Sequence, residues 1–434
     1  MSAPLCVTAQ ELASRGDIRK AVRTAAPCHL HYNGPGAAGF GVKRTAMLLP
    51  ESAMLLVAPS CCGRHGTVTG KKTGFDERMF YLCLDERDVA TGAYLKRIPQ
   101  AAECVCRKNS PRALFLCMTC VDALLGTDLD RIGRQIQEKI GIPVVSCFMD
   151  PIARETRKAP MVSVQQAIMR CLQKGSPEKD AVNLLGGFVP LDASSELPEV
   201  LAQAGIRTIR QISACRTFDE YQEMGRSSLN IVINAQAQEA ARDLQKRIGI
   251  PWTPMACTYG VSRTRKEYEN LALAFGAALD TERYAQDAQN TLDEFAARHR
   301  GISVAVGEAV VGSPLEIALT LLEAGIDVPL LFRTLVQPSD MPLVRLIAER
   351  APDLKIYSGV HPSMQSADFS GISADVALGL DAGYFLPQAV SVCWSSERQP
   401  LGFGGLKSLI AQIEESIQRP KTHREQMHGS YLVV

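Results

Sequence analysis

Short apolar runs alternate along the chain with longer segments whose apolar residues recur at helical spacing. The segment 112–120 is an apolar run, 126–141 has helical spacing, and 142–148 is apolar again. Short apolar runs predict buried strands, and apolar residues three and four positions apart predict amphipathic helices. The same alternation returns at 228–252 and 302–334. Strands that alternate with helices predict parallel sheets with helices on both faces.

Three such α/β units follow one another along the chain. We therefore predict three doubly wound parallel-sheet (Rossmann-like) domains, with boundaries in the segments 175–187 and 280–300. The predicted domains are an N-terminal cluster-binding domain, a second Rossmann-like domain, and a third with the C-terminal segment. Their ranges are 1–180, 181–300 and 301–434.

Composition and charge narrow the class of protein. The chain has 434 residues, of which 46% are hydrophobic and 21% charged, with a net charge of +1. This balance predicts a globular protein without a nucleic-acid surface. The first twenty residues carry acids and lack an apolar core, so we expect no signal peptide. No uncharged apolar stretch reaches the roughly 18 residues of a spanning helix. We therefore expect a cytoplasmic protein without a membrane partner.

The cysteines are concentrated in the first third of the chain. A cytoplasmic protein rarely uses structural disulfides, and any single thiol is readily explained as a small buried hydrophobe. A local excess of thiols instead predicts a metal or cluster site. Nine of the fourteen cysteines precede residue 121: Cys6, Cys28, Cys61, Cys62, Cys83, Cys104, Cys106, Cys117 and Cys120.

Two segments resemble nucleotide-binding motifs but lack the residues or neighbouring elements that such motifs require. Gly34, Gly36 and Gly39 match the dinucleotide fingerprint, but no strand precedes them and no clean helix follows. A glycine-rich segment that lets the backbone approach a bulky group fits as well. The segment 70–74 lacks the first glycine of a phosphate loop, and Lys72 stands where Ser or Thr is required. We therefore expect no ATP hydrolysis by this chain.

Thiols at three places in the sequence follow predicted elements and could be ligands of one cluster. Cys117 falls within a predicted strand and Cys120 at its carboxyl end, while Cys61 and Cys62 follow another apolar run. Doubly wound sheets bind ligands at the carboxyl ends of their strands. Iron–sulfur clusters are held by Cys thiolates, commonly four. Cys28, which opens the glycine-rich segment, would be the third position, and a fourth ligand would come from elsewhere, such as another subunit.

Five segments resemble the catalytic-component subunits of nitrogenase and its relatives. The relatives include protochlorophyllide reductases, a nickel-tetrapyrrole reductase and methylthio-alkane reductases. The family pattern has a first Cys before a glycine-rich stretch, a second Cys ending a Gly-Pro-containing segment, and a third in a Thr-Cys motif with a following Gly-x-Asp. The resembling segments are 28–63, 82–102, 118–132, 248–268 and 393–410.

This resemblance implies a ligand set. Cys28 would be the first ligand and Cys62 the second, with Cys61 at a position usually occupied by glycine. Cys120 would be the third, with Gly126 and Asp128 in register. On an extended segment only one thiol of the Cys61–Cys62 pair faces a cluster, whereas at a turn both could reach it.

The resemblance also implies cofactors and partners. The cofactor would be an iron–sulfur cluster, either 4Fe-4S or a P-cluster-like 8Fe-7S, that bridges two subunits. The second subunit would be a paralogous component 1-like chain or a second copy of this one. The electron donor would be an ATP-dependent iron protein, and the substrate a small molecule.

Two departures from the family pattern bear on the reaction. In molybdenum nitrogenase one Cys and one His hold the large cofactor, and these positions fall at about Ala241 and Leu401. Dinitrogen reduction is therefore not expected. Cys257 could replace the lost Cys, although a role as a buried loop thiol explains it better.

We expect an oxidoreductase subunit that reduces a substrate other than dinitrogen. The alternative is a scaffold for assembly of a metal cofactor, without substrate turnover. A metal-receptor module is disfavoured by the cysteine excess.

The remaining polar candidates have simpler explanations. Cys104 and Cys106 fall late in a predicted helix, where solvent exposure or packing explains them. Cys83 could approach a cluster, but a strand-core role is favoured, and Cys117 should face away from Cys120 into the core. His29 and His31 could tune a cluster, although a surface role is favoured. His361 and Glu308 follow predicted strands and are candidate proton donors.

Overall fold

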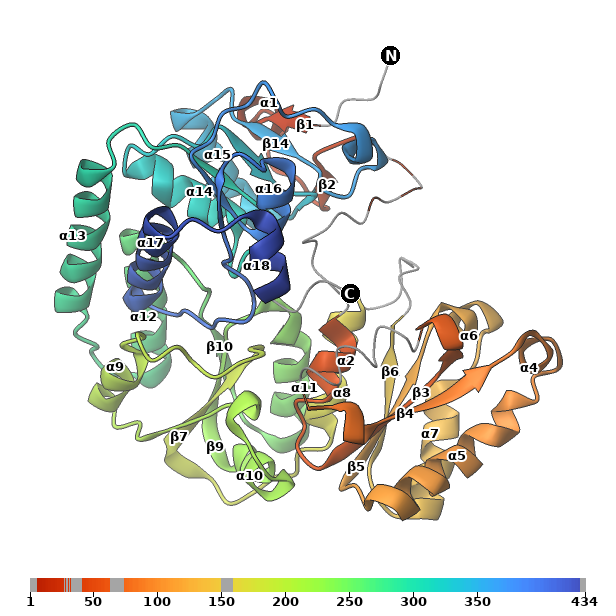
Figure 1. Ribbon diagram of the computed structural model, residues 1–434. Helices are drawn as coiled ribbons and strands as arrows, with labels where there is room; N and C mark the ends of the chain where they lie inside the picture. Colours follow the sequence, from red (N-terminus) through yellow and green to blue (C-terminus); the bar gives the residue numbers. More distant parts are fainter. Residues whose placement is uncertain are drawn as a thin grey trace. The chain divides into compact units, whose positions relative to one another are not determined.

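The computed structural model describes residues 6–26, 28, 30, 32, 41–62, 74–149 and 159–429. The chain divides into two compact units, described separately below (Figure 1). The cysteine-rich unit, which contains ten of the fourteen cysteines, is Phe40–Pro190 with Gly205–Met255. The six-stranded unit is Met1–Gly39, Leu191–Ala204 and Ala256–Val433.

The first sheet of the cysteine-rich unit has four parallel strands in the order β4-β3-β5-β6. The chain runs from β3 to β4 on one side and then returns to the other side of β3 for β5 and β6. The strand order therefore reverses between β3 and β5. The strands are β3 (Ser52–Pro59), β4 (Met79–Leu84), β5 (Ala113–Met118) and β6 (Val144–Phe148).

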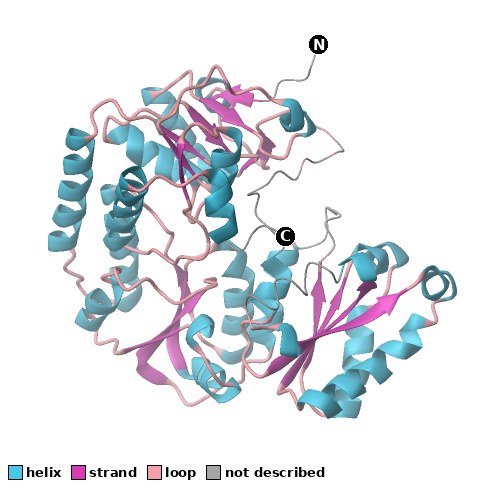
Figure 2. Cartoon of the chain, viewed as in Figure 1, coloured by secondary structure: helices cyan, strands magenta, loops and turns pink. Residues whose placement is uncertain are grey.

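Both faces of this sheet are buried because successive side chains point to opposite sides. Leu55 and Val57 pack with α5 and α7 on one face, whereas Met54 and Leu56 pack with α2 and α8 on the other. Figure 2 shows helices flanking the strands. The helices are α2 (Gly41–Ala46), α4 (Glu86–Thr91), α5 (Tyr94–Asn109), α6 (Cys120–Leu125), α7 (Leu129–Ile140) and α8 (Pro160–Arg170).

A second parallel sheet in the same unit repeats this topology. Its order is β10-β9-β7-β8, with the reversal between β7 and β9. The side chains of Asn183 and Asn230 are fully buried in it and share a hydrogen bond of 2.8 Å. The elements are β7 (Glu178–Leu185), β8 (Thr208–Arg210), α10 (Phe218–Glu223), β9 (Ser227–Val232), α11 (Gln238–Ile248) and β10 (Trp252–Pro254).

The six-stranded unit contains the third sheet, in the order β1-β14-β12-β11-β15-β16. Only β1 is antiparallel, and the chain order reverses between β11 and β15. The strands are β1 (Cys6–Thr8), β11 (Val304–Val306), β12 (Leu330–Phe332), β14 (Lys355–Tyr357), β15 (Val376–Leu378) and β16 (Val390–Val392), and β2 (Val22–Arg23) pairs with β13 (Leu335–Val336).

Helices complete the six-stranded unit. They are α1 (Ala9–Ala13), α9 (Leu197–Gln203), α12 (Val261–Phe275), α13 (Glu282–Arg298), α14 (Pro314–Glu323), α15 (Met341–Arg350), α16 (Leu380–Phe385), α17 (Phe403–Gln418) and α18 (His423–Gly429).

The α/β class and the predominantly parallel, doubly wound sheets are confirmed. The domain ranges 1–180, 181–300 and 301–434 stay predictions. Residues 6–8 pair with residues 355–357 of β14 at the edge of the third sheet. A three-residue strand is too short for this long-range pairing to be predicted from the sequence. Among the helices that the structure describes, none is long and apolar enough to cross a membrane.

A buried carboxylate organises the start of α17. Glu196 is 5% exposed, and it accepts hydrogen bonds from the backbone N–H groups of Phe403 and Gly404 at 2.7 and 2.9 Å. The Tyr268 hydroxyl donates to the same carboxylate at 2.5 Å. An acceptor at a helix N-terminus satisfies free N–H groups and complements the helix dipole. Glu196 therefore joins α12, α17 and the segment before α9.

We predict that Glu196→Ala lowers the free energy of unfolding by about 2–4 kcal/mol, because it leaves three buried donors without their acceptor. Urea denaturation followed by the fluorescence of Trp394, a buried residue of the same unit, measures the change. The matched control is Glu199→Ala, whose exposed ion pair with Arg283 should contribute less than about 1 kcal/mol. Equal losses in the two variants would contradict the assigned role of Glu196.

Candidate functional site

The candidate site lies where the strand order of the first sheet reverses. β3 and β5 are adjacent and parallel, with Leu56 opposite Cys117 and Val57 opposite Met118. Their carboxyl ends therefore finish at the same edge of the sheet. Loops that leave in opposite directions at such a reversal open a crevice that binds ligands in α/β proteins. Cys61 and Cys62 follow β3, and Cys120 follows β5.

Cys61 and Cys62 lie in a turn rather than in an extended segment. The chain is helical over 60–62, so the two side chains are not forced to opposite sides. Their Sγ atoms are 4.0 Å apart. Both thiols are free, with Cys61 exposed and Cys62 partly buried. Of the two backbone arrangements left open by the sequence, the structure shows the turn.

Cys120 is the first residue of α6, a six-residue helix that the sequence did not reveal. Gly126 ends this helix in a left-handed conformation (φ 69°). The next helix begins at Leu129, within the segment 126–141 that the sequence predicted to be helical, and the Asp128 side chain caps it by accepting a hydrogen bond from Arg131 N at 3.0 Å. The sulfur of Cys120 thus belongs to a helix that starts directly at the edge of the sheet.

A lysine lies beside these thiols. Lys43 of α2 donates a hydrogen bond of 3.2 Å to the Cys62 carbonyl oxygen. Burial and the neighbouring Cys61 thiol raise the pKa of Cys62, and the charge of Cys120 raises it further, while the Lys43 ammonium opposes the shift. Burial lowers the pKa of Lys43, and the nearby Cys117 and Cys62 oppose that shift. The three thiols and one cation therefore form a single electrostatic group.

The other thiols of the unit have structural environments. Cys117 and Cys147 are fully buried, and burial raises the pKa of Cys117 to about 12 and that of Cys147 further above its ordinary value. They stay protonated and act as core residues. Cys104 and Cys106 lie late in α5, as expected. Cys83, predicted to be a strand-core residue, is exposed in β4. That prediction was wrong because β4 lies at the edge of the sheet.

Cys28 belongs to the six-stranded unit. It lines a small hollow there with Arg23, Leu30, Ser358 and His361. The His361 ring is buried, and its Nδ1 accepts a hydrogen bond from Ser363 N at 3.3 Å. The ligand role of Cys28 stays a prediction. His29, His31 and the glycine segment with Gly34, Gly36 and Gly39 lie outside the described residues, as does most of the segment 70–74.

A carboxyl pair lies at the strand-order reversal of the third sheet. Glu308, after β11, accepts hydrogen bonds from Thr334 N and Oγ1 at 3.0 and 2.6 Å. Asp381 Oδ2 accepts from the backbone N–H groups of Glu308 and Ala309. Burial raises the pKa of Asp381 to about 6. Sequence reasoning missed Asp381, although the glycine before it, Gly379 (φ 102°), signals a turn at a strand end.

The positions where the resemblance would put cofactor ligands are apolar. Ala241 is fully buried in α11, and Leu401 is 1% exposed. Cys257 donates a hydrogen bond of 3.1 Å to the Pro400 carbonyl, and burial raises its pKa to about 12. This thiol therefore keeps its proton and acts as a structural donor.

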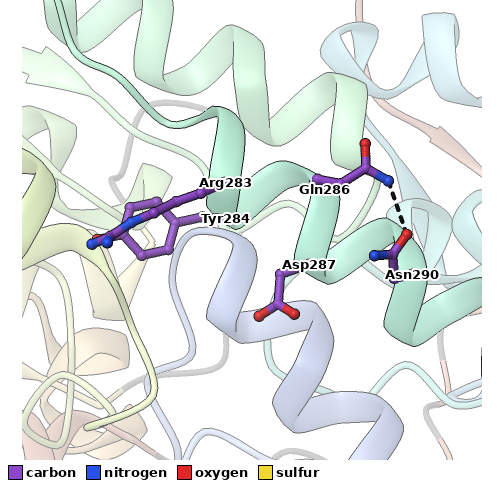
Figure 3. A pocket seen from close by; sticks show the side chains of 5 residues that line it. All are labelled: Arg283, Tyr284, Gln286, Asp287 and Asn290. Carbon is purple, nitrogen blue, oxygen red and sulfur yellow. Dashed lines mark hydrogen bonds between the residues drawn. The ribbon is translucent and has the colours of Figure 1, made fainter.

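An open hollow along α13 carries no comparable chemistry. Figure 3 shows its five lining side chains, two of which share a hydrogen bond from Gln286 Nε2 to Asn290 Oδ1 of 2.8 Å. Tyr284 donates to Glu199, and Asp287 pairs with Lys407. Within the described part of the chain, no three His, Cys, Asp or Glu side chains converge closely enough to hold a single metal ion.

Comparison with known proteins identifies similar sequences. A model of the family described as nitrogenase component 1 type oxidoreductase matches residues 37–418. The nitrogenase iron-molybdenum cofactor biosynthesis protein NifE of Klebsiella pneumoniae is 27% identical over 259 residues, 56% of this chain and 56% of that protein. Its counterpart from Rhodobacter capsulatus is 24% identical over 409 residues, 89% of this chain and 85% of that protein. The chain thus spans only about half the length of some of these relatives.

Two further similarities concern nitrogenase itself. The nitrogenase molybdenum-iron protein alpha chain of Methanothermobacter marburgensis is 24% identical over 296 residues, 65% of this chain and 59% of that protein. A solved structure titled nitrogenase Cp1 at pH 6.5 matches with a TM-score of 0.69 at 16% identity, over 91% of this chain and 94% of that one. This structural likeness shows the fold.

We predict that Lys43→Met slows alkylation of Cys62 by iodoacetamide at pH 8 by about two- to fivefold, because loss of a nearby positive charge raises a thiol pKa and lowers its thiolate fraction. Mass spectrometry resolves the rate at Cys62. Lys139→Met removes a lysine paired with Glu103 elsewhere in the unit and serves as the control. An unchanged rate in Lys43→Met, or an equal effect in the control, would contradict the electrostatic role of Lys43.

Proposed function

The chain belongs to the nitrogenase component 1 type oxidoreductase family, and we propose that it is a scaffold on which an iron–sulfur-based metal cofactor is assembled. The observation that carries the proposal is the group of free thiols, Cys61, Cys62 and Cys120, at the strand-order reversal of the first sheet. Several relatives are named as iron-molybdenum cofactor biosynthesis proteins, which supports a scaffold role. The maturing cofactor would be cargo, and the chain would turn over no substrate.

The donor set suits an iron–sulfur group. Cysteine thiolates are the usual ligands of such clusters, and hydrogen bonds to cluster sulfurs tune them. The buried Thr119 hydroxyl, next to Cys120, has no hydrogen-bond partner within the described residues. It is a donor suited to a sulfide at this position. Cys62 and Cys120 would hold the cluster from this unit, and the ligand role of Cys28 stays a prediction from the family resemblance.

The chain's own residues would prepare the thiols for a ligand. Lys43 favours the thiolate of Cys62, and the core thiols Cys117 and Cys147 keep their protons and do not compete for iron. When bound, an iron–sulfur cluster supplies one-electron redox chemistry. Exposed Leu124 and Leu125 lie on α6, close in sequence to Cys120.

The proposed partners follow from the family and the ligand count. Clusters commonly have four thiolate ligands, so a paralogous component 1-like subunit or a second copy of this chain would complete the site. The cluster would then be of the 4Fe-4S or the larger 8Fe-7S type and would bridge the subunits. An ATP-dependent iron protein would supply electrons for cofactor maturation.

The apolar positions argue against dinitrogen reduction. Ala241 and Leu401 offer no metal ligand, and the Cys257 thiol is committed to the Pro400 carbonyl. A mature cofactor could not be held by one Cys and one His at these places. This supports a role in which a cofactor or precursor binds transiently.

A second candidate function is a nitrogenase-like reductase subunit for a substrate other than dinitrogen. The oxidoreductase description of the family and the similarity to a nitrogenase alpha chain favour it. In this case the thiol-bound cluster would pass electrons from the iron protein to a small molecule. Both functions require the same cluster site.

We predict that Cys120→Ala, and likewise Cys62→Ala, loses most of the iron and acid-labile sulfide bound by the anaerobically purified protein, because each removes a thiolate ligand. The measurement combines iron and sulfide counts with the EPR spectrum. Cys83→Ala, an exposed thiol of the same unit, is the matched control and should keep the cluster. Undiminished iron in Cys120→Ala would contradict the ligand assignment.

A transfer experiment separates the two functions. For a scaffold, we expect ⁵⁷Fe bound to the chain to pass to a cofactor-free nitrogenase-type catalytic component, as measured by Mössbauer spectroscopy of the separated proteins. For a reductase, the label would stay in place, and iron protein with MgATP would support many turnovers of a small-molecule substrate. Turnover without transfer would overturn the scaffold proposal.

A further inference from the structure

The spacing of the Cys61 and Cys62 sulfurs matches that of two ligands on one metal atom. Their Sγ atoms are 4.0 Å apart. A tetrahedral metal with metal–sulfur bonds near 2.3 Å places two thiolate sulfurs about 3.8 Å apart. A disulfide would require about 2.05 Å, and neighbouring residues have Cα atoms too close for a relaxed one. The observed spacing is therefore compatible with chelation of one ion and not with a disulfide.

We propose that Cys61 and Cys62 together chelate a single thiophilic divalent ion such as Fe²⁺, and that this pair is where iron first binds during cofactor assembly. The proposal rests on the proposed scaffold function and extends it to the chemical form of the incoming iron. The single ion would use both Cys61 and Cys62 as ligands, whereas the cluster would use only Cys62 of this pair. Cys61, the thiol that the family resemblance leaves without a role, thereby becomes a metal ligand.

The surroundings suit a site that loads and releases an ion. Cys61 is exposed and Cys62 partly buried, so an ion can reach the pair from solvent. No third His, Cys, Asp or Glu of the described residues converges on a common ion. The remaining coordination positions would hold water or an incoming sulfide. Two protein ligands bind an ion less tightly than the four of a closed structural site.

The binding step balances in protons and charge. One M²⁺ replaces the protons of two thiols, two metal–sulfur bonds form, and two H⁺ leave to solvent. No electron is transferred, so no oxidant or reductant is required. Because two protons leave for each ion bound, the affinity should rise with pH more steeply than at a site with a single thiolate ligand.

Anaerobic titration with Co²⁺, a spectroscopic probe for Fe²⁺, tests the site in the full chain. The background is Cys120→Ser, which under the proposed function carries no cluster. We expect one Co²⁺ per chain, with a sulfur-to-cobalt charge-transfer band and a two-proton pH dependence. Cys61→Ser should weaken Co²⁺ binding by at least about 100-fold. Loss of an outer-shell partner alone costs a metal site up to about 100-fold in affinity, and Cys61 would be a direct ligand. Cys83→Ser, the exposed thiol on β4, should leave binding unchanged.

The cluster measurement separates failure of this inference from failure of the proposed function. If both hold, Cys61→Ser alone keeps the cluster, Cys120→Ser loses the cluster but binds Co²⁺, and adding Cys61→Ser to Cys120→Ser removes the Co²⁺ site. Unchanged Co²⁺ affinity and band intensity when Cys61→Ser is added to Cys120→Ser, or a one-proton pH dependence, would overturn the chelation proposal and leave the cluster site standing. Full cluster content in Cys120→Ser would overturn the proposed cluster site and leave the pair standing.

Discussion

The parallel pairing of β3 with β5 is the constraint on which the candidate site depends. Because Leu56 pairs with Cys117 and Val57 with Met118, the two strands finish at the same edge of the sheet. The chain leaves β3 toward β4 and leaves β5 toward β6, so the two connections diverge there. A crevice opens where connections diverge in this way. The Cys61–Cys62 turn and the start of α6 therefore lie in one region, with Lys43 beside them.

The same reversal recurs in the other two sheets but presents different chemistry. Between β11 and β15 it brings together Glu308 and the buried Asp381, whose carboxylates are bonded to nearby backbone N–H groups and to the Thr334 hydroxyl. These bonds hold the loops of the third sheet. Repetition of one topology thus yields a thiol group in one sheet and a structural carboxyl pair in another. The residues after the strands, rather than the fold, decide which site can bind metal.

Much of this arrangement could be predicted from the sequence, and the other features could not be predicted for physical reasons. Apolar periodicity predicted β5, α7 and β6 around Cys120 because that signal is local. The six-residue α6 and the three-residue β1 are too short to show a period. Strand order depends on pairings between distant segments, so the reversal beside Cys61 was not visible. The exposure of Cys83 follows from that strand order as well.

The proposed function, in either of its two forms, depends on thiolates at the strand-order reversal that hold an iron–sulfur cluster. Iron K-edge X-ray absorption of the anaerobically purified full chain tests it most directly, because the spectrum reports the atoms around iron. The account predicts a first shell of sulfur and a second shell of iron. A first shell of nitrogen and oxygen with no iron neighbour, or a protein purified without iron, would contradict it.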